Sequence, residues 1–149
     1  MEFPYFKVID FPKHQKRERI LPWIRFGIFN LKDKTRILYP VGLVDSGSDV
    51  TIADHEFAKE LGIEIKKGEK SKIYGVGGGS LEVWFHKVGL FIHNGSDKKL
   101  VVYQDFVGFT YEKFPFSMPQ QTAILGTIGF FRNLKVALEY PKRMVIRPK

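Results

Sequence analysis

Residues 43–51 read Leu-Val-Asp-Ser-Gly-Ser-Asp-Val-Thr, so the carboxylate of Asp45 follows an apolar run and precedes three small residues. An isolated charge in an apolar setting costs on the order of several kcal/mol unless it is paired, hydrogen-bonded or protonated. Asp45 is therefore expected to have a defined partner or a chemical role. The structural alternative is an ordinary turn aspartate, because Asp-Ser-Gly is common in turns.

The length and the composition of the chain indicate which class of protein it belongs to. The chain has 149 residues, of which 44% are hydrophobic and 15% aromatic. These values predict one folded domain over residues 1–149 with a real core. The sequence has no apolar run of about 18 residues, and its N-terminus, MEFPYFKVIDF, lacks the basic-then-apolar layout of a signal peptide. We therefore expect a cytoplasmic protein with no membrane partner.

The cysteine content and the net charge limit the kinds of site and partner that the protein can have. The absence of cysteine excludes disulfides, zinc–thiolate sites and cysteine nucleophiles. The formal net charge of +8 raises the alternative of a nucleic-acid partner. The basic residues are scattered along the chain, however, and no nucleic-acid-binding motif accompanies them. They are interpreted as a solvated surface, and no nucleic-acid partner is expected.

Most segments are short, rich in β-branched and aromatic residues and bounded by Gly, Pro, Asn or Asp, which predicts an all-β fold. The two strands before Asp45 are expected to form a hairpin around the polar turn 30–34. Asp54 is expected to cap a helix that runs to about Leu61 and ends at Gly62. The predicted strands cover 20–29, 35–44, 71–74, 81–85, 87–93, 99–109 and 123–126, followed by a short turn or helix near Phe130 and a hairpin over 135–148 that turns at Pro141 and Lys142.

The glycine run at residues 75–80 is also compatible, at first sight, with a dinucleotide-binding loop. The third glycine of that fingerprint would fall on Ser80, however, and the next segment is strand-like where the fingerprint requires a helix. A nucleotide site is therefore not expected. The structural alternative is a flexible surface hairpin.

The histidines and serines show no recognisable site. His14, His55, His86 and His93 lack metal-site spacing: His55 has no second histidine four residues on, and His86 and His93 would fall on opposite faces of a strand. No Gly-x-Ser-x-Gly elbow is present. No metal ligand is therefore predicted.

Three motifs in a fixed order carry a resemblance to a known family. Asp45-Ser46-Gly47-Ser48 follows an apolar pair, a glycine-tipped hairpin comes next at Ile73-Tyr74-Gly75-Val76-Gly77-Gly78-Gly79, and Ile124-Leu125-Gly126 comes third. In this order the chain resembles the retropepsin-like aspartic proteases, which include the retroviral proteases and are single-domain relatives of pepsin. The similarity covers residues 20–148, nearly the whole chain.

The resemblance implies a closed-barrel fold with one or two short helices, and a homodimer that hydrolyses peptide bonds without a metal or an organic cofactor. Asp45 would be the catalytic residue, supplied once by each subunit, in an active-site loop formed with Ser46, Gly47 and Ser48. The segment Ile73 to Gly79 would be a flap that contacts substrate. Ile124, Leu125 and Gly126 would support the loop, where a side chain at position 126 would collide with it.

Some features depart from the family pattern. The flap carries an extra glycine and Tyr74 near its tip, and two segments, residues 1–19 and 106–121, look longer than in a minimal retroviral enzyme. Either segment is compatible with a dimer element, a substrate lid or additional core. The alternative function is a non-catalytic dimeric module of the same fold that binds a peptide or an acidic ligand, because a fold alone does not establish activity.

Overall fold

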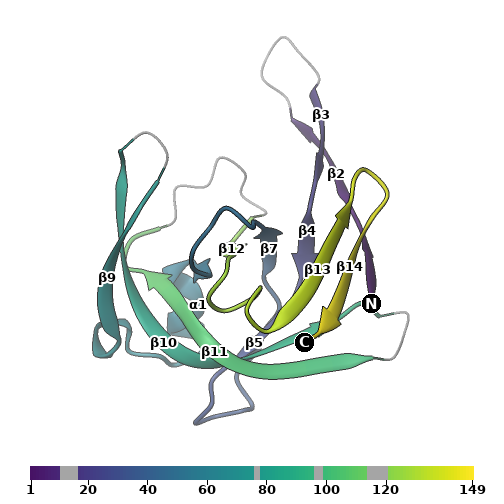
Figure 1. Ribbon diagram of the computed structural model, residues 1–149. Helices are drawn as coiled ribbons and strands as arrows, with labels where there is room; N and C mark the ends of the chain where they lie inside the picture. The colour runs from purple at the N-terminus through teal and green to yellow at the C-terminus, as the bar shows by residue number, and fades with distance from the viewer. Residues whose placement is uncertain (11–16, 76–77, 96–98, 114–120) are drawn as a thin grey trace.

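The protein is mostly β-structure, which confirms the all-β prediction (Figure 1). The computed structural model describes residues 1–10, 17–75, 78–95, 99–113 and 121–149. The strands are β1 (Glu2–Pro4), β2 (Phe6–Asp10), β3 (Arg17–Leu21), β4 (Trp23–Arg25), β5 (Gly27–Phe29), β6 (Ile37–Leu38), β7 (Val41–Val44), β8 (Ile52–Ala53), β9 (Glu69–Tyr74), β10 (Ser80–His93), β11 (Leu100–Thr110), β12 (Ala123–Leu125), β13 (Leu134–Glu139) and β14 (Arg143–Pro148). Two short helical segments join them, α1 (His55–Glu60) and the 3₁₀ turn η1 (Ile65–Lys67).

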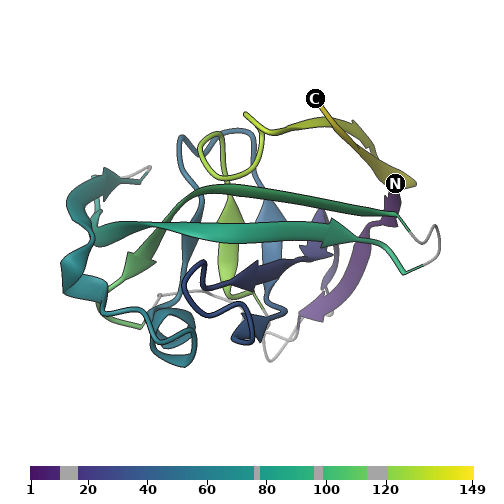
Figure 2. The ribbon, with the colours of Figure 1, turned by 90° about the horizontal axis from the view of Figure 1, so that it is seen from below.

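A nine-stranded sheet forms the body of the molecule. Its strands lie in the order β4-β7-β12-β8-β11-β10-β5-β6, with β9 paired to β10. Strands β10 and β11 are the longest antiparallel pair, running from Val83 opposite Thr110 to His93 opposite Leu100. Figure 2 shows this pair crossing the molecule side by side.

The sheet curls because the hairpin that precedes Asp45 contributes to both ends of the strand order. One side of this hairpin consists of β4 and β5, and the other consists of β6 and β7. Between the paired segments, the amide of Phe26 donates to the carbonyl of Pro40 at 3.2 Å. The first and last strands of the sheet order, β4 and β6, therefore both belong to this hairpin. The two continuous strands expected over 20–29 and 35–44 are each split: Pro22 separates β3 from β4, Phe26 separates β4 from β5, and the break between β6 and β7 contains Pro40.

The helix α1 begins as the sequence predicts. The side chain of Asp54 accepts a hydrogen bond of 3.0 Å from the amide of Glu56, as an N-cap residue does. Ala58 and Leu61 are fully buried against the sheet, and Gly62 follows with a φ of +71°. Such a φ favours glycine, which explains where the helix stops.

The two ends of the chain form a separate three-stranded sheet with the order β1-β14-β13. Phe3 lies opposite Met144, and both side chains are buried. The first and last strands of the chain therefore pair with each other within one chain. The C-terminal hairpin occupies its predicted range, and the segment around Phe130, expected as a short turn or helix, is a turn.

The core lies between the curled sheet, α1 and the terminal sheet. Its largest fully buried side chains include Phe109, Phe130, Ile24, Leu61 and Met144. Each such side chain contributes roughly 1.5–3 kcal/mol relative to exposure, so the core fixes the strands that carry Asp45. Within the described ranges, no helix is long and apolar enough to cross a membrane.

Candidate active site

Asp45 stands at the end of β7, beside a parallel neighbour that comes from far along the chain. Leu43 and Val44 of β7 lie opposite Ile124 and Leu125 of β12. The amide of Asp45 donates to the carbonyl of Leu125 at 3.1 Å, which extends the pairing by one residue. Because Val44 and Leu125 are buried, two packed strands fix the backbone from which the carboxylate emerges.

The residues after Asp45 fold into a tight turn that orients its carboxylate. Oδ1 of Asp45 accepts a hydrogen bond of 2.9 Å from the amide of Gly47, and its carbonyl accepts one of 3.2 Å from the amide of Ser48. The hydroxyl of Ser48 donates to the carbonyl of Val50 at 2.8 Å. Asp45 is half-buried, whereas Ser46 and Gly47 are exposed. The carboxylate therefore keeps access to solvent while its own loop fixes its direction.

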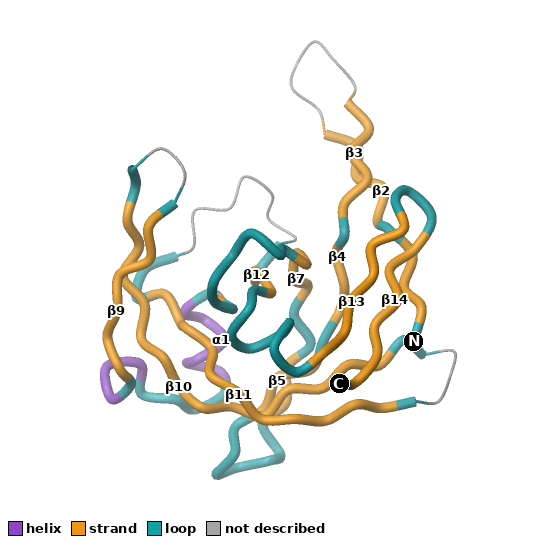
Figure 3. Tube along the Cα trace, viewed as in Figure 1, coloured by secondary structure: helices purple, strands orange, loops and turns teal. Residues whose placement is uncertain are grey.

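A second segment, residues 126–129, is hydrogen-bonded to this loop; it leaves the end of β12 beside the loop that leaves β7 (Figure 3). The amides of Thr127 and Ile128 donate to the carbonyls of Ser48 and Asp49, both at 2.9 Å. A Cβ atom at position 126 would lie 2.3 Å from the carbonyl oxygen of Val50, a distance that real Cβ atoms do not reach. The backbone of Gly126 thus touches the backbone of the loop, with no room for a side chain.

The glycine-tipped hairpin of β9 and β10 rises opposite the loop. Tyr74 lies opposite Ser80, and the amide of Gly75 donates to the carbonyl of Gly79 at 2.9 Å. Gly78 has a φ of +83°, which only glycine adopts readily. Val76 and Gly77, two of the predicted flap residues, lie outside the described residues.

The hairpin and the loop share one cleft of about 450 Å³. The loop and its surroundings contribute Asp45, Gly47, Ser48, Ile52 and Ile124 to its lining, and the hairpin contributes residues 73–75 and 79–81. The structure thus brings most of the predicted loop and flap residues to a single space. Ser46 lies on the exposed loop, and Leu125 and Gly126 are buried behind it.

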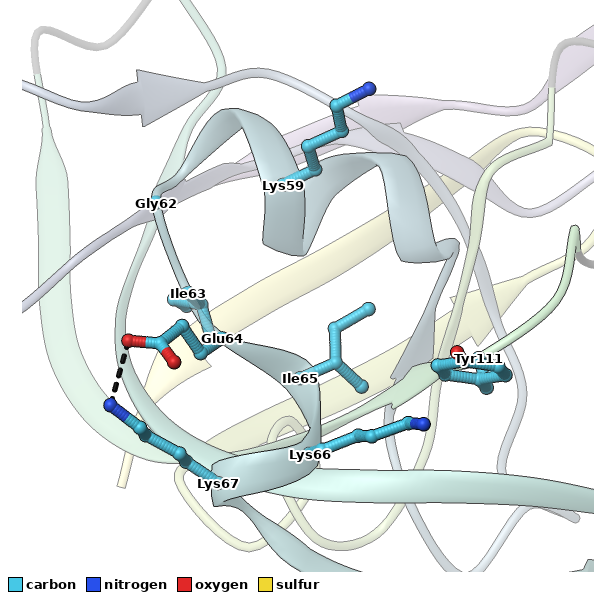
Figure 4. A pocket seen from close by; sticks show the side chains of 8 residues that line it. All are labelled: Lys59, Gly62, Ile63, Glu64, Ile65, Lys66, Lys67 and Tyr111. Carbon is cyan, nitrogen blue, oxygen red and sulfur yellow. Dashed lines mark hydrogen bonds and ion pairs between the residues drawn. The ribbon is translucent and has the colours of Figure 1, made fainter.

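A larger hollow, of about 590 Å³, lies elsewhere (Figure 4). It is lined by Lys59, by residues 62–67 and by Tyr111, whose ring centre lies 4.7 Å from the Nζ atom of Lys66. The carboxylate in its lining, that of Glu64, is paired with Lys67 at 2.7 Å. We place the candidate site in the smaller cleft because that cleft holds a carboxylate whose direction is fixed and which has no cationic partner in the loop.

Asp105 is an important acidic residue that the sequence analysis did not single out. It is buried in β11 and accepts hydrogen bonds from the side chains of Arg132 and Asn133 and from the amides of Phe106 and Gly129. Burial acts to raise the pKa of this carboxyl, but these hydrogen bonds outweigh it and hold the pKa below its ordinary value. A signal was present in the sequence, since Asp105 shares an inward strand face with Tyr103 and Val107.

Asp105 and the residues that donate to it form the Asp105 cluster. This cluster is connected to the Asp45 loop through residues 126–129, which both contact. Gly129 donates to Oδ2 of Asp105 at 3.1 Å, and its carbonyl accepts from the hydroxyl of Tyr103 at 3.2 Å. Burial, together with the charge of Asp105, raises the pKa of Tyr103, so this hydroxyl stays protonated as a donor. One residue earlier, the carbonyl of Ile128 accepts from the amide of Thr51 at 2.7 Å. Asp105 therefore holds the segment against which the Asp45 loop rests.

The acidic and histidine side chains are spread over the described part of the chain. Among the described residues, no group of three or more such side chains is placed to hold a metal ion. A ring nitrogen of His86 lies 2.8 Å from the carbonyl oxygen of Ile65, a contact that joins β10 to η1.

A scan against protein-family models and a search of the curated proteins find no match to this chain.

Proposed function

We propose that the protein is an aspartic endopeptidase with a retropepsin-like fold, in which two subunits each supply one Asp45. The observation that carries the proposal is the position of Asp45: it ends β7 beside the parallel strand β12 and lines a cleft whose opposite wall is a glycine-tipped hairpin. The return of the strand order to the β4–β7 hairpin supports the closed-barrel part of the proposal. Loop, hairpin and supporting glycine also occur in the family's order.

The cleft itself argues for a second subunit. Among the described residues that line it, Asp45 is the one acidic side chain. Asp54 caps α1, Asp105 is held by Arg132, and Asp33 is engaged in its own exposed turn. A two-fold axis places the same residue on both partners, so one Asp45 per chain becomes two facing carboxylates. The exposed Ser46 would then face the partner loop.

Two adjacent carboxylates supply both an acid and a base. Because like charges about 3 Å apart do not both ionise readily, the pair holds one proton. The ionised carboxylate takes a proton from a water molecule, whose oxygen forms a bond to the scissile carbonyl carbon, while the protonated carboxyl donates to the carbonyl oxygen. Collapse of the tetrahedral intermediate breaks the C–N bond: the proton taken from water passes to the leaving amine, and the carboxylate that donated to the carbonyl oxygen takes a proton back from a hydroxyl of the intermediate.

The neighbouring residues position the substrate. Gly47 keeps the backbone beside Asp45 free of side-chain bulk, and Ile52, Ile73, Leu81 and Ile124 give the cleft apolar walls. The glycine-tipped hairpin would close over a bound peptide and exclude water, as active-site lids do.

The test is digestion of a peptide library at several pH values by the wild type, Asp45→Asn and Asp49→Asn. Asp49 is the control, because it is an exposed aspartate of the same loop outside the cleft lining. The wild type and Asp49→Asn should cleave with a bell-shaped pH profile, and Asp45→Asn should not cleave although it stays folded. Cleavage by Asp45→Asn at near wild-type rate would exclude this mechanism. A folded wild type that binds peptides but cleaves none would favour the non-catalytic module.

A further inference from the structure

The hairpin of β2 and β3, here called the arm, is paired with nothing else in the described chain. It forms its own two-stranded sheet, with Phe6 opposite Leu21 and Asp10 opposite Arg17. An isolated two-stranded hairpin is at best marginally stable in water and needs a third strand or a packing surface. The arm is therefore expected to have a partner beyond the contacts of its own domain.

The side chains of the arm agree with this expectation. Phe6 is 43% exposed and Ile9 is 57% exposed. They lie on opposite faces of the strand because their separation in sequence is odd. The ring centre of Phe6 lies 6.3 Å from that of the buried Trp23, so one face of the arm packs in part on the body, whereas Ile9 on the other face is mostly exposed.

A second exposed apolar group adjoins the arm. The rings of Tyr5 and Tyr140 meet edge to face with their centres 5.6 Å apart, which joins the base of the arm to the end of the β13–β14 hairpin. Tyr140 and Leu138, at that end, are exposed. The terminal surface, defined here as Phe6, Ile9, Leu138 and Tyr140, therefore spans two elements.

The direction of the arm suggests what covers this surface. In Figure 1 the arm, the end of the β13–β14 hairpin and the loop after β7 all point to the same side of the molecule. That side is the one on which a second Asp45 has to arrive. A partner subunit seated there would meet the arm and the active-site loop together.

We propose that the terminal surface binds a second copy of this chain and that the arm is an intersubunit contact of the dimer. This inference rests on the proposed function, which requires a second copy on this side. Each copy carries a formal charge of +8, so two copies repel one another. Apolar side chains that project beyond the body can provide the attraction that the charges do not. Because salt screens the repulsion between the two positive copies, added salt should strengthen association.

The experiment compares two double variants that match in exposure. Phe6→Ser/Ile9→Ser changes the arm, and Phe106→Ser/Leu100→Ser is the control, because Phe106 and Leu100 are also 43% and 57% exposed but lie on β11. Circular dichroism checks that both variants fold. Sedimentation equilibrium at low and high salt then gives the dimer Kd of each protein.

The arm variant should raise the dimer Kd at least tenfold, whereas the control should leave it within about twofold of the wild type. A wild-type Kd that falls as salt is added supports the apolar contact, and one that rises contradicts it. A dimer whose Kd is unchanged in the arm variant would overturn the arm proposal and leave the proposed function standing. A wild type that is monomeric at every concentration overturns the arm proposal, and if that monomer is fully active the proposed function falls as well.

Discussion

The amide of Gly126 donates a hydrogen bond of 3.0 Å to the hydroxyl of Thr51, across 75 positions of sequence and in a fully buried setting. Thr51 ends the loop that begins at Asp45, and Gly126 follows the strand that pairs with β7. This one contact therefore ties the far end of the Asp45 loop to the segment that supports it. The direction of the Asp45 carboxylate depends on backbone packing by Thr51 and Gly126, which do not line the cleft.

Gly126→Ala should destabilise the protein, because the new Cβ would lie 2.3 Å from the carbonyl oxygen of Val50 and 2.7 Å from that of Ser48. These are backbone atoms, which cannot move aside as the end of a side chain does. We expect a loss of about 1–3 kcal/mol in the free energy of unfolding, typical of overpacking. Gly79→Ala is the control, since a Cβ there meets nothing within 4 Å. Urea titrations that give equal midpoints for both variants would show that the backbone of the Asp45 loop can move enough to accept the added methyl group.

Thr51→Val should cost about 1–3 kcal/mol, because it keeps the shape of the side chain but leaves the buried amide of Gly126 without an acceptor. Thr51→Ser retains the hydroxyl and should recover most of this loss. The measurement is urea unfolding of the two variants beside the wild type. Equal stability of the valine and serine variants would mean that the hydrogen bond is unimportant.

The local parts of this fold could be predicted from the sequence. The Asp54 cap, the glycine that ends α1 and the C-terminal hairpin depend on residues close together in the chain. Strand β10 was instead expected as two pieces, 81–85 and 87–93. His86 continues the pairing with Val107, and no glycine or proline interrupts the strand at that point.

The long-range contacts around the site had no comparable local signal. Asp105 meets Arg132 and Asn133 from 27 and 28 positions away, and Trp23 donates to the side chain of Gln121 at 3.1 Å across 98 positions. Burial in the folded state selects these partners, and polar residues in a strand or a turn do not reveal them individually. The resemblance supplied the order of the loop, the hairpin and the supporting strand. It did not supply the cluster that holds residues 126–133.

Asp105→Asn should destabilise the protein most at neutral pH. The asparagine amide would present donor hydrogens to Arg132 and Asn133, which are themselves donors, so charge-assisted hydrogen bonds worth about 1–3 kcal/mol are lost. Because the folded pKa of Asp105 is lowered, its stabilisation is complete above the ordinary carboxyl pKa of about 4 and is lost as the pH falls through the lower folded value.

The check is the free energy of unfolding of the wild type and Asp105→Asn from pH 7 down to acid. The difference between them should be constant near neutrality and shrink below about pH 4. Glu64→Gln, which removes an exposed ion pair with Lys67, serves as the control and should change little at any pH. A difference that does not depend on pH would mean that the Asp105 carboxylate does not stabilise the fold through its charge.

Gly78→Ala should lower peptide turnover more than Gly79→Ala. An L-residue at the φ of +83° found at Gly78 is strained by roughly 1–2 kcal/mol, so the alanine variant should alter the hairpin tip. Gly79 has no such φ and has open space around it. Gly79→Ala should unfold at nearly the wild-type temperature, and Gly78→Ala should lose no more stability than this strain, because the tip lies outside the core. Equal kcat/KM values for the two variants would mean that the backbone conformation of the tip does not affect catalysis.

Mixing subunits tests whether two copies of Asp45 act together. If wild type is mixed with a threefold excess of Asp45→Asn and the subunits exchange at random, about one quarter of the wild-type subunits should find a wild-type partner. Activity per wild-type subunit should then fall to about one quarter, because a heterodimer holds one carboxylate and lacks the acid–base pair. An equal excess of Asp49→Asn, which keeps Asp45, should not suppress activity. Activity per wild-type subunit that does not change with added Asp45→Asn, under conditions where mixed dimers are detected by mass spectrometry, would mean that one chain contains the complete site.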